Sequence, residues 1–121
     1  MKSNILIVED DEAIRESLIE LLETEGYCVK AAENGQVALD YLITSQNHPN
    51  LILLDLMMPV MGGLEFCIEM EKNKKLSQIP IVIMSADGRL QEKQNLSRAM
   101  GFIRKPVDID DILATVKKYC Q

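Results

Sequence analysis

The sequence predicts an α/β protein in which helices cover both faces of a five-stranded parallel sheet. Five short apolar runs of strand length recur along the chain, and a stretch with helical apolar spacing follows each of them. Parallel strands need crossover connections, and these are right-handed, so strict alternation of strand and helix gives a doubly wound (βα)5 fold. The 121 residues suit a single domain, residues 1–121, with one core.

The first half of the chain contains two strand-and-helix units. An apolar run ends at three consecutive acids, after which apolar residues repeat at helical spacing until a glycine closes the pattern. Asn34 and Gly35 then mark a turn or a helix cap before the second helix. The expected elements are a strand at 5–8, a helix at 12–26, a strand at 28–32 and a helix that ends near the loop at 45–49.

The second half adds three more units. The expected elements are strands at 51–55, 81–84 and 102–104, and helices at 64–70, 87–100 and 109–116. The helix at 87–100 has few apolar positions, so we expect it to be the least firmly held element. The last helix has aspartates at its start and Lys117 and Lys118 at its end, which is the charge order that the helix dipole favours.

The composition excludes several classes of protein. With 19 acidic and 13 basic residues, the net charge of −6 opposes direct binding to nucleic acid or to an anionic membrane. No apolar run approaches the roughly 20 residues of a membrane span, and the N-terminus lacks the pattern of a signal peptide, so we expect a cytoplasmic protein. Cys28, Cys67 and Cys120 are odd in number and widely spaced, which favours buried thiols over a disulfide or zinc framework.

The stretch from Leu51 to Gly63 contains the residue around which a candidate site is arranged. Four apolar residues lead into Asp55, and a carboxylate at the end of a buried strand is costly unless something pairs with it. The carboxyl ends of the other strands supply candidate partners, because ligands bind at that edge of such sheets. These candidates are Glu9, Asp10 and Asp11 after the first strand, Ser85 after the fourth and Lys105 after the fifth.

The chemistry of these residues suits a metal ion and a phosphoryl group. Close carboxylates repel by about 4 kcal/mol at an intermediate dielectric, so clustered acids protonate or bind a cation. Oxygen ligands with room for water favour Mg²⁺, which often bridges to a phosphate. Lys105 and Ser85 are suited to hold phosphoryl oxygens, and Asp55 is the natural nucleophile for an acyl phosphate. The plainer alternative is that the acids only cap helices, which suits Asp11 best.

Four motifs resemble the receiver domain of bacterial two-component response regulators, over essentially the whole chain. They are ILIVEDDE at 5–12, LILLDLMMPVMGG at 51–63, IVIMSA at 81–86 and FIRKP at 102–106. Each motif alone is modest, but their order and approximate spacing together are specific for the family. The resemblance implies the strand order 2-1-3-4-5 of flavodoxin-like sheets, as in the chemotaxis regulators of the same family.

The resemblance also implies how the acids hold a metal. It assigns Asp10 as a direct ligand of Mg²⁺ and Glu9 as a ligand that acts through water. It makes Asp55 both the phosphoacceptor and a metal ligand, and it adds the backbone carbonyl of Met57 to the coordination sphere. Mg²⁺ is therefore the implied cofactor.

A second set of implied roles concerns the response to phosphorylation. Ser85 corresponds to the hydroxyl residue that turns toward the phosphoryl group, and Lys105 corresponds to the lysine that pairs with it. Phe102 occupies the aromatic switch position, which moves inward with the hydroxyl residue; plain core packing is the alternative for this side chain. The bond between Lys105 and Pro106 corresponds to the cis peptide of the family. One phosphoryl charge would then bias a two-state element.

The implied function is that of a signalling domain, not an enzyme, which assists only its own phosphorylation and dephosphorylation. A histidine kinase or phosphotransfer protein donates the phosphoryl group, and a downstream protein reads the face made by the fourth helix, fifth strand and fifth helix. We expect a monomer or a weak phosphorylation-dependent dimer. Two alternatives stay open. The first is an aspartyl-nucleophile phosphatase, which needs a second acid two residues after the nucleophile, where this chain has Met57. The second is a flavodoxin-like flavin carrier, but the acids after the first strand would repel the phosphate of the flavin.

Three features depart from the family pattern. The spacing between Ser85 and Lys105 is shorter than usual, which affects the expected output face more than the site. Gly62 stands where an acid or asparagine is frequent, which makes the loop after the third strand more flexible. Met57 and Asp87 occupy two positions that, in this family, tune how long the phosphoryl group survives.

Overall fold

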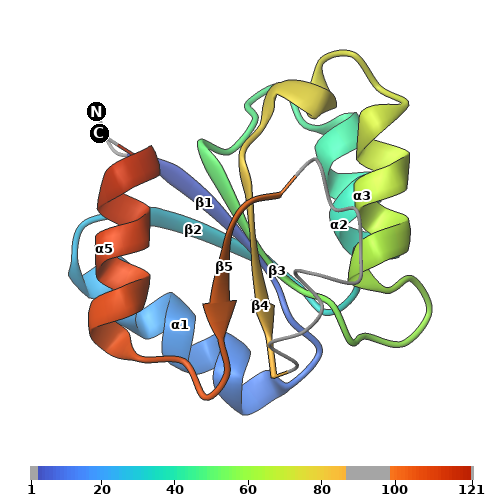
Figure 1. The fold of residues 1–121 in the computed structure, drawn as a ribbon. Coiled ribbons are helices and arrows are strands. Elements are labelled where there is room, and N and C mark those ends of the chain that lie inside the picture. Colours follow the sequence, from blue (N-terminus) through green and yellow to red (C-terminus); the bar gives the residue numbers. More distant parts are fainter. Residues whose placement is uncertain (1–2, 87–98, 121) are drawn as a thin grey trace.

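A five-stranded parallel sheet lies between two layers of helices in the computed structural model, which describes residues 3–86 and 99–120, with only the backbone described at 99 and 100 (Figure 1). The strand order is β2-β1-β3-β4-β5, which confirms the predicted fold class and topology. Along the chain the elements are β1 (Asn4–Val8), α1 (Glu12–Thr24), β2 (Cys28–Ala32), α2 (Gly35–Thr44), β3 (Leu51–Asp55), α3 (Gly63–Glu71), a short 3-10 helix η1 (Leu76–Gln78), β4 (Ile81–Ser85), β5 (Ala99–Arg104) and α5 (Ile109–Tyr119).

The pairing of the strands brings their carboxyl ends to one edge of the sheet. In the β3–β4 pair Asp55 lies opposite Met84, and in the β4–β5 pair Ser85 lies opposite Arg104. β1 pairs in parallel with the other side of β3 and ends at the same edge. Residues that end or follow these strands therefore lie close together, although they are far apart in the sequence.

Among the described residues, two α-helices cover each face of the sheet. Alternate residues of a strand project to opposite faces, so each strand contributes to two separate cores. One core faces α2 and α3, and the other faces α1 and α5 (Figure 1). Every residue of β3 and of β4 is buried, which explains why both strands are continuously apolar up to their last residue.

Side-chain caps fix where three of the helices begin. The Oδ1 atoms of Asp11 and Asn34 each accept a hydrogen bond from the backbone N–H three residues later, at 3.0 and 2.9 Å. The Oδ1 of Asp108 accepts from the amide of Asp110 at 2.7 Å. These bonds satisfy amides that have no partner within the helix. Asp11 is thus the N-cap of α1, which is the alternative that the sequence offered for it.

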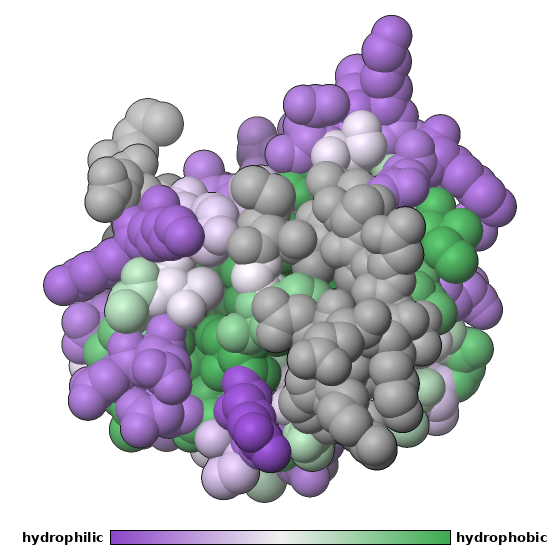
Figure 2. Space-filling model, viewed as in Figure 1, coloured by the Kyte–Doolittle hydropathy of each residue, from purple (hydrophilic) through white to green (hydrophobic). Residues whose placement is uncertain are grey.

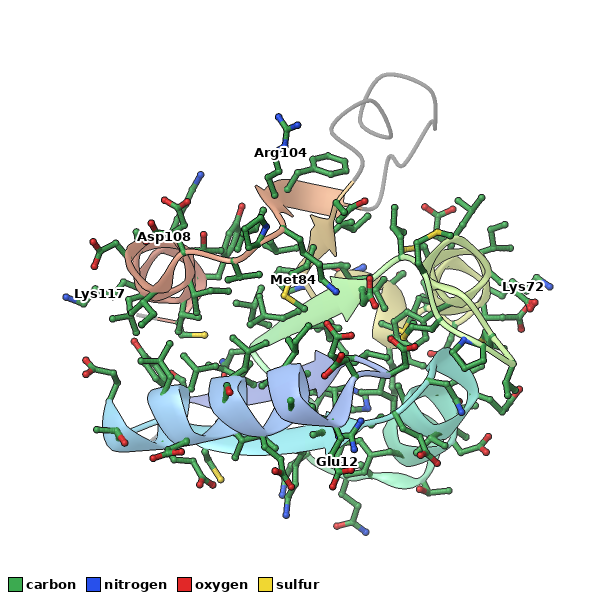
Figure 3. All side chains as sticks on the ribbon, turned by 90° about the horizontal axis from the view of Figure 1, so that it is seen from below. Glu12, Lys72, Met84, Arg104, Asp108 and Lys117 are labelled. Carbon is green, nitrogen blue, oxygen red and sulfur yellow. The ribbon has the colours of Figure 1, made fainter. Side chains whose placement is uncertain are left out.

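Apart from the buried Glu9 and Asp55, charged side chains of the described residues lie mainly at the surface. Lys72, Arg104, Asp108 and Lys117 point away from the cores (Figure 3). Hydrophilic residues cover much of the face seen in Figure 2, while hydrophobic residues come to the surface on the right, over α3, where Leu64 is among the exposed apolar side chains. Within the described stretches, no helix has the length and apolar character needed to cross a membrane.

The start of β5 differs from the prediction. The strand begins at Ala99 rather than at Phe102, so Ala99 and Met100 belong to a strand and not to the end of the expected helix. Ala99 pairs with Ile81 of β4, and this pairing outweighs the intrinsic helix preference of alanine and methionine. The rest of the expected helix, at 87–98, lies outside the described residues, as does the segment in which the shortened spacing falls.

The cysteine prediction holds for two residues and is wrong for the third. Cys67 and Cys120 are buried, but Cys28 is exposed. Cys28 is the first residue of β2, which is an edge strand, and most of this strand is open to solvent. Its apolar neighbours in sequence therefore do not bury it.

Candidate metal and phosphoryl-acceptor site

Three carboxylates gather at the carboxyl edge of the sheet. Glu9 and Asp10 follow β1, Asp55 ends the neighbouring strand β3, and one carboxylate oxygen from each lies within 4.8 Å of the others. Glu9 is fully buried and Asp55 is 4% exposed, whereas Asp10 is open to solvent. Figure 3 shows side-chain oxygens beyond the ends of β1 and β3. The cluster therefore has two buried members and one through which solvent and ligands gain access.

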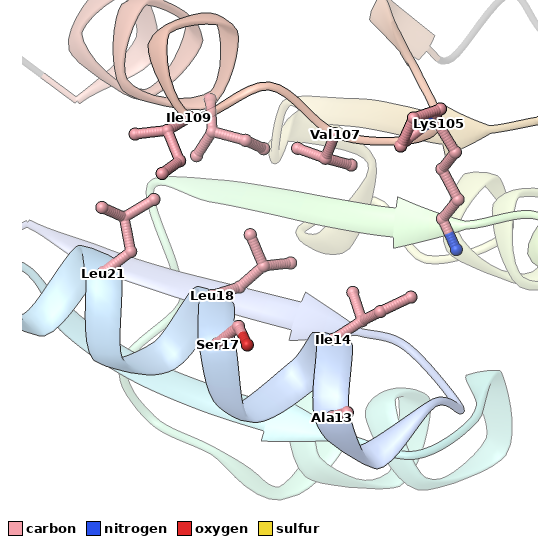
Figure 4. Close-up of a pocket in the computed structure, with 10 residues that line it drawn as sticks. Ala13, Ile14, Ser17, Leu18, Leu21, Lys105, Val107 and Ile109 are labelled. Atoms are coloured by element: carbon pink, nitrogen blue, oxygen red, sulfur yellow. The ribbon is translucent and has the colours of Figure 1, made fainter.

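Lys105 brings a positive charge to the two buried acids. Its Nζ donates a hydrogen bond of 2.8 Å to Glu9 Oε1 and lies 3.4 Å from Asp55 Oδ2. The side chain extends from the loop after β5 toward the end of β3 (Figure 4). The backbone N–H of Lys105 donates to the carbonyl of Ser85 at 2.9 Å, which ties this loop to the end of β4. The peptide bond between Lys105 and Pro106 is cis.

Burial and charge shift the pKa values of this pair in a defined direction. Burial raises the pKa of Glu9 from 4.5 to about 7, and the negative charge of Asp55 adds to this rise. The hydrogen bonds from Lys105 and from the amide of Asp11 act in the opposite direction but do not outweigh burial. Burial also acts to lower the pKa of Lys105, but the hydrogen bond to Glu9 and the charge of Asp55 outweigh it, so this pKa is raised. The raised pKa keeps Lys105 protonated at neutral pH, whereas a pKa of about 7 brings the titration of Glu9 into this range.

The other predicted residues lie around this cluster. Ser85 is buried at the end of β4. The backbone N–H of Met57 donates to Asp55 Oδ1 at 3.2 Å, while its side chain is 74% exposed. Phe102, in β5, is half-buried and packs against the core that faces α2 and α3. The structure therefore brings the predicted acids, the serine and the lysine to one edge of the sheet, with Met57 in the following loop.

The loop between β3 and α3 is held by close backbone contacts. Met61 N–H donates to the carbonyl of Pro59 at 2.8 Å, which closes a turn around Val60, and Val60 has a φ of +67°. The N–H of Gly35 donates to the carbonyl of Met61 at 3.1 Å. At the other end, a Cβ on Gly63 would lie 2.8 Å from the carbonyl oxygen of Asp55. The loop is therefore packed tightly against the strand that carries the candidate nucleophile.

Arg15 is a contributor that the sequence analysis missed. From α1 its Nη1 donates to the carbonyl of Glu9 at 2.9 Å and reaches the carbonyl of Asp10 at 3.4 Å. The signal in the sequence is weak, because the only trace is a basic residue one turn into the helix that follows the acids.

An apolar groove of about 410 Å³ runs beside the site, between α1 and the segment that follows β5 (Figure 4). Lys105 lines it together with apolar side chains, among them Ile14, Leu18, Val107 and Ile109. Lys105 therefore borders both the acidic cluster and an apolar surface.

The donor set fits Mg²⁺. All three side chains offer hard oxygen atoms, which is what this ion prefers, and the exposed position of Asp10 leaves room for the waters that Mg²⁺ retains. Among the described residues, Lys105 alone pairs with the two buried acids, which leaves net negative charge at the site and favours a divalent cation.

Fold and site together define a flavodoxin-like domain with an acidic pocket, of a composition that suits Mg²⁺, at the carboxyl edge of its sheet. A family model described as the response regulator receiver domain matches residues 5–117. The chain belongs to this family. Receiver domains are signalling modules of two-component systems and not classical enzymes, so the phosphatase and flavin-carrier alternatives have no support.

Individual relatives agree with this assignment. Sporulation initiation phosphotransferase F of Bacillus subtilis is 41% identical, over 98% of this chain and 94% of that protein. Response regulator MprA of a Mycobacterium species is 34% identical over 97% of this chain, and the match covers 50% of the length of MprA. Among solved structures, the response regulator TrrA of Thermotoga maritima, in complex with Mg²⁺ and BeF, superimposes with a TM-score of 0.85 at 34% identity, covering 98% of this chain and 99% of that one.

Proposed function

We propose that Asp55 is the phosphoacceptor of this receiver domain, and that a histidine kinase or a phosphotransfer protein is the donor. The observation that carries the proposal is the position of Asp55 at a strand end, 4% exposed, within 4.8 Å of two other acids and 3.4 Å from Lys105. A carboxylate held this way is costly without a ligand and suited to react with an electrophilic phosphorus. Membership of the two-component family supports the class of donor.

Asp10 and Asp55 are the proposed direct ligands of Mg²⁺, with the backbone carbonyl of Met57 as a third and Glu9 acting through water. The complex of the Thermotoga relative with Mg²⁺ and BeF supports Mg²⁺ binding by a domain of this fold and family. When bound, Mg²⁺ neutralises the charge that develops on the phosphoryl oxygens. The exposed Asp10 gives the ion access, while the two buried acids provide the charge that retains it.

The proposed transfer is an in-line displacement at phosphorus. A carboxylate oxygen of Asp55 forms a P–O bond while the P–N bond to the donor histidine breaks, and the imidazole leaves with the electron pair. Lys105 stays protonated through this step because its pKa is raised, so it is available as a cation for the phosphoryl oxygens. The Ser85 hydroxyl is the proposed neutral donor to the same group.

Phosphorylation changes which anion Lys105 faces, and this is the proposed origin of the switch. Before transfer its ammonium group binds Glu9 and approaches Asp55; after transfer the phosphoryl oxygens become its strongest partner. Ser85 would turn toward the same group, and Phe102 would move deeper into the space that the serine leaves. The resulting change in β5 and α5 is the signal that a downstream protein would read.

Reaction with a small phosphodonor tests the proposal directly. We expect acetyl phosphate with Mg²⁺ to add one phosphoryl group by intact-mass spectrometry, and beryllofluoride to shift the amide NMR signals of Ser85 and Phe102. Asp55→Asn abolishes both responses if Asp55 is the acceptor. Asp40→Asn, at an exposed acid on α2, is the matched control and leaves both unchanged. The chain has no tryptophan, so these readouts replace indole fluorescence.

Phosphorylation of the Asp55→Asn variant at the rate of the parent would show that another residue is the nucleophile. A parent protein that binds beryllofluoride only without Mg²⁺ would contradict the metal assignment and leave the acceptor assignment intact. Peptide mapping of the phosphorylated parent then identifies the modified residue.

A further inference from the structure

Arg15 holds the backbone that carries two of the three acids. Its Nη1 donates to the carbonyl of Glu9 at 2.9 Å and lies 3.4 Å from that of Asp10. The amide of the same residue donates to the carbonyl of Asp11 at 2.9 Å, as the first hydrogen bond of α1. Arg15 is half-buried, so this contact is partly shielded from water. One residue thus binds all three consecutive carbonyls of the acidic loop.

The acids of this loop differ in what holds their side chains. The Glu9 carboxylate accepts from Lys105 and from the amide of Asp11, and the Asp11 carboxylate accepts from the amide of Ile14. Within residues 3–86 and 99–120, no hydrogen bond or ion pair reaches the carboxylate of Asp10. The position of Asp10 is therefore set by its backbone, and its backbone is restrained by Arg15.

We infer that Arg15 is a positioning residue for Mg²⁺ binding, acting through the backbone of Asp10. The inference rests on the proposed metal site and assigns Arg15 no contact with the ion. Groups that orient a metal ligand typically contribute a factor of about 10 to 100 in affinity. A guanidinium suits this task because it presents planar, rigid donors, whereas a lysine ammonium is a flexible point charge.

The direction of the effect separates positioning from plain electrostatics. Arg15 is a cation near an acidic site, so by charge alone its removal should tighten Mg²⁺ binding. Positioning predicts the opposite result, which is weaker binding. Arg104→Ala is the matched control, because it removes the same kind of side chain and the same charge from an exposed position, at the last residue of β5 opposite Ser85.

The experiment measures Mg²⁺ dissociation constants by calorimetry for the parent, Arg15→Ala, Arg15→Lys and Arg104→Ala. We expect Arg15→Ala to bind about 10-fold more weakly, Arg15→Lys to recover only part of the loss, and Arg104→Ala to match the parent. Unchanged or tighter binding by Arg15→Ala would overturn the inference. If the alanine variant does not fold in EDTA, Arg15→Lys serves as the test, because it keeps the positive charge but lacks the planar guanidinium donors. Parental Mg²⁺ affinity in Arg15→Lys would contradict the inference.

A double-mutant cycle with Asp10→Asn tests whether Arg15 acts through Asp10. If it does, Arg15→Ala causes no further loss of affinity in the Asp10→Asn background, whereas a general structural role gives additive losses. The amide NMR signals of Asp10 and Asp11 in the metal-free protein give a readout that is independent of activity, and we expect them to shift in Arg15→Ala. A parent that binds no Mg²⁺ would refute the metal site itself, which is a separate outcome.

Discussion

Lys105 donates a 2.8 Å hydrogen bond to Glu9, a residue 96 positions earlier in the chain that has no exposed surface. This bond joins the loop after β5 to the end of β1, across the width of β3 and β4. It also means that, in the absence of Mg²⁺, the ammonium group of Lys105 supplies the positive charge that the acids need. Lysine and metal therefore compete for the same carboxylates.

The competition predicts how Lys105→Met behaves. Without the ammonium group, Glu9 and Asp55 keep their backbone hydrogen bonds but lose the cation between them, so we expect the metal-free protein to lose about 1–3 kcal/mol of unfolding free energy at pH 8. The loss should be smaller at pH 6, because Glu9 then takes up a proton. Mg²⁺ should bind more tightly than to the parent. Urea unfolding and calorimetry measure the two effects, with Lys117→Met as the exposed control. Weaker Mg²⁺ binding by Lys105→Met would argue against competition.

The raised pKa of Glu9 predicts an unusual pH dependence of stability. The folded protein favours the protonated form, so the contribution of Glu9 is fully present below its ordinary pKa of 4.5 and is lost as pH rises through about 7. In EDTA the unfolding free energy of the parent, relative to Glu9→Gln, should fall across this window by at most about 3 kcal/mol. Saturating Mg²⁺ should oppose the fall, because it favours the ionised acid. If the unfolding free energy of the parent relative to Glu9→Gln instead rose with pH in EDTA, the raised pKa of Glu9 would be contradicted.

The strands and the gathering of Glu9, Asp10, Asp55 and Lys105 at one edge could be predicted because both follow from local patterns, whereas the chemical roles of these residues stay predictions. Both ends of Leu51–Asp55 are predicted correctly, because a continuous apolar run indicates a buried central strand and the acid that follows it marks the carboxyl end of that strand. The site residues followed from the rule that parallel strands end at one edge. No pattern of residue types, however, could reveal that Arg15 binds backbone carbonyls, because such contacts depend on how a helix enters the loop. The start of β5 was wrong for a similar reason, as its extension to Ala99 depends on pairing with β4.

Gly63 is expected to tolerate no side chain. A Cβ there would lie 2.7 Å from Leu56 Cα and 2.8 Å from the carbonyl oxygen of Asp55, and backbone atoms cannot move aside as a flexible side chain does. We expect Gly63→Ala to lower the unfolding free energy by roughly 2–4 kcal/mol in urea denaturation. Gly101→Ala is the control, because its Cβ would find neighbours only at 3.8 Å, and its effect should be within about 0.5 kcal/mol. Equal effects of the two substitutions would show that the contact is not restrictive.

Val60 predicts a substitution that stabilises the protein. Its φ of +67° is in the left-handed region, which is unfavourable for a β-branched residue by about 1–2 kcal/mol, and its side chain is 81% exposed, so little packing would be lost. Glycine also increases the backbone entropy of the unfolded chain, which offsets part of this relief. Val60→Gly should therefore raise the unfolding free energy, measured in urea, by up to about 1 kcal/mol. The same substitution at Val37, in the first turn of α2, should instead cost roughly 0.3–0.5 kcal/mol, because the backbone there is helical and glycine is a poorer helix former than valine. A loss of stability in Val60→Gly would mean that the turn after Asp55 is not strained.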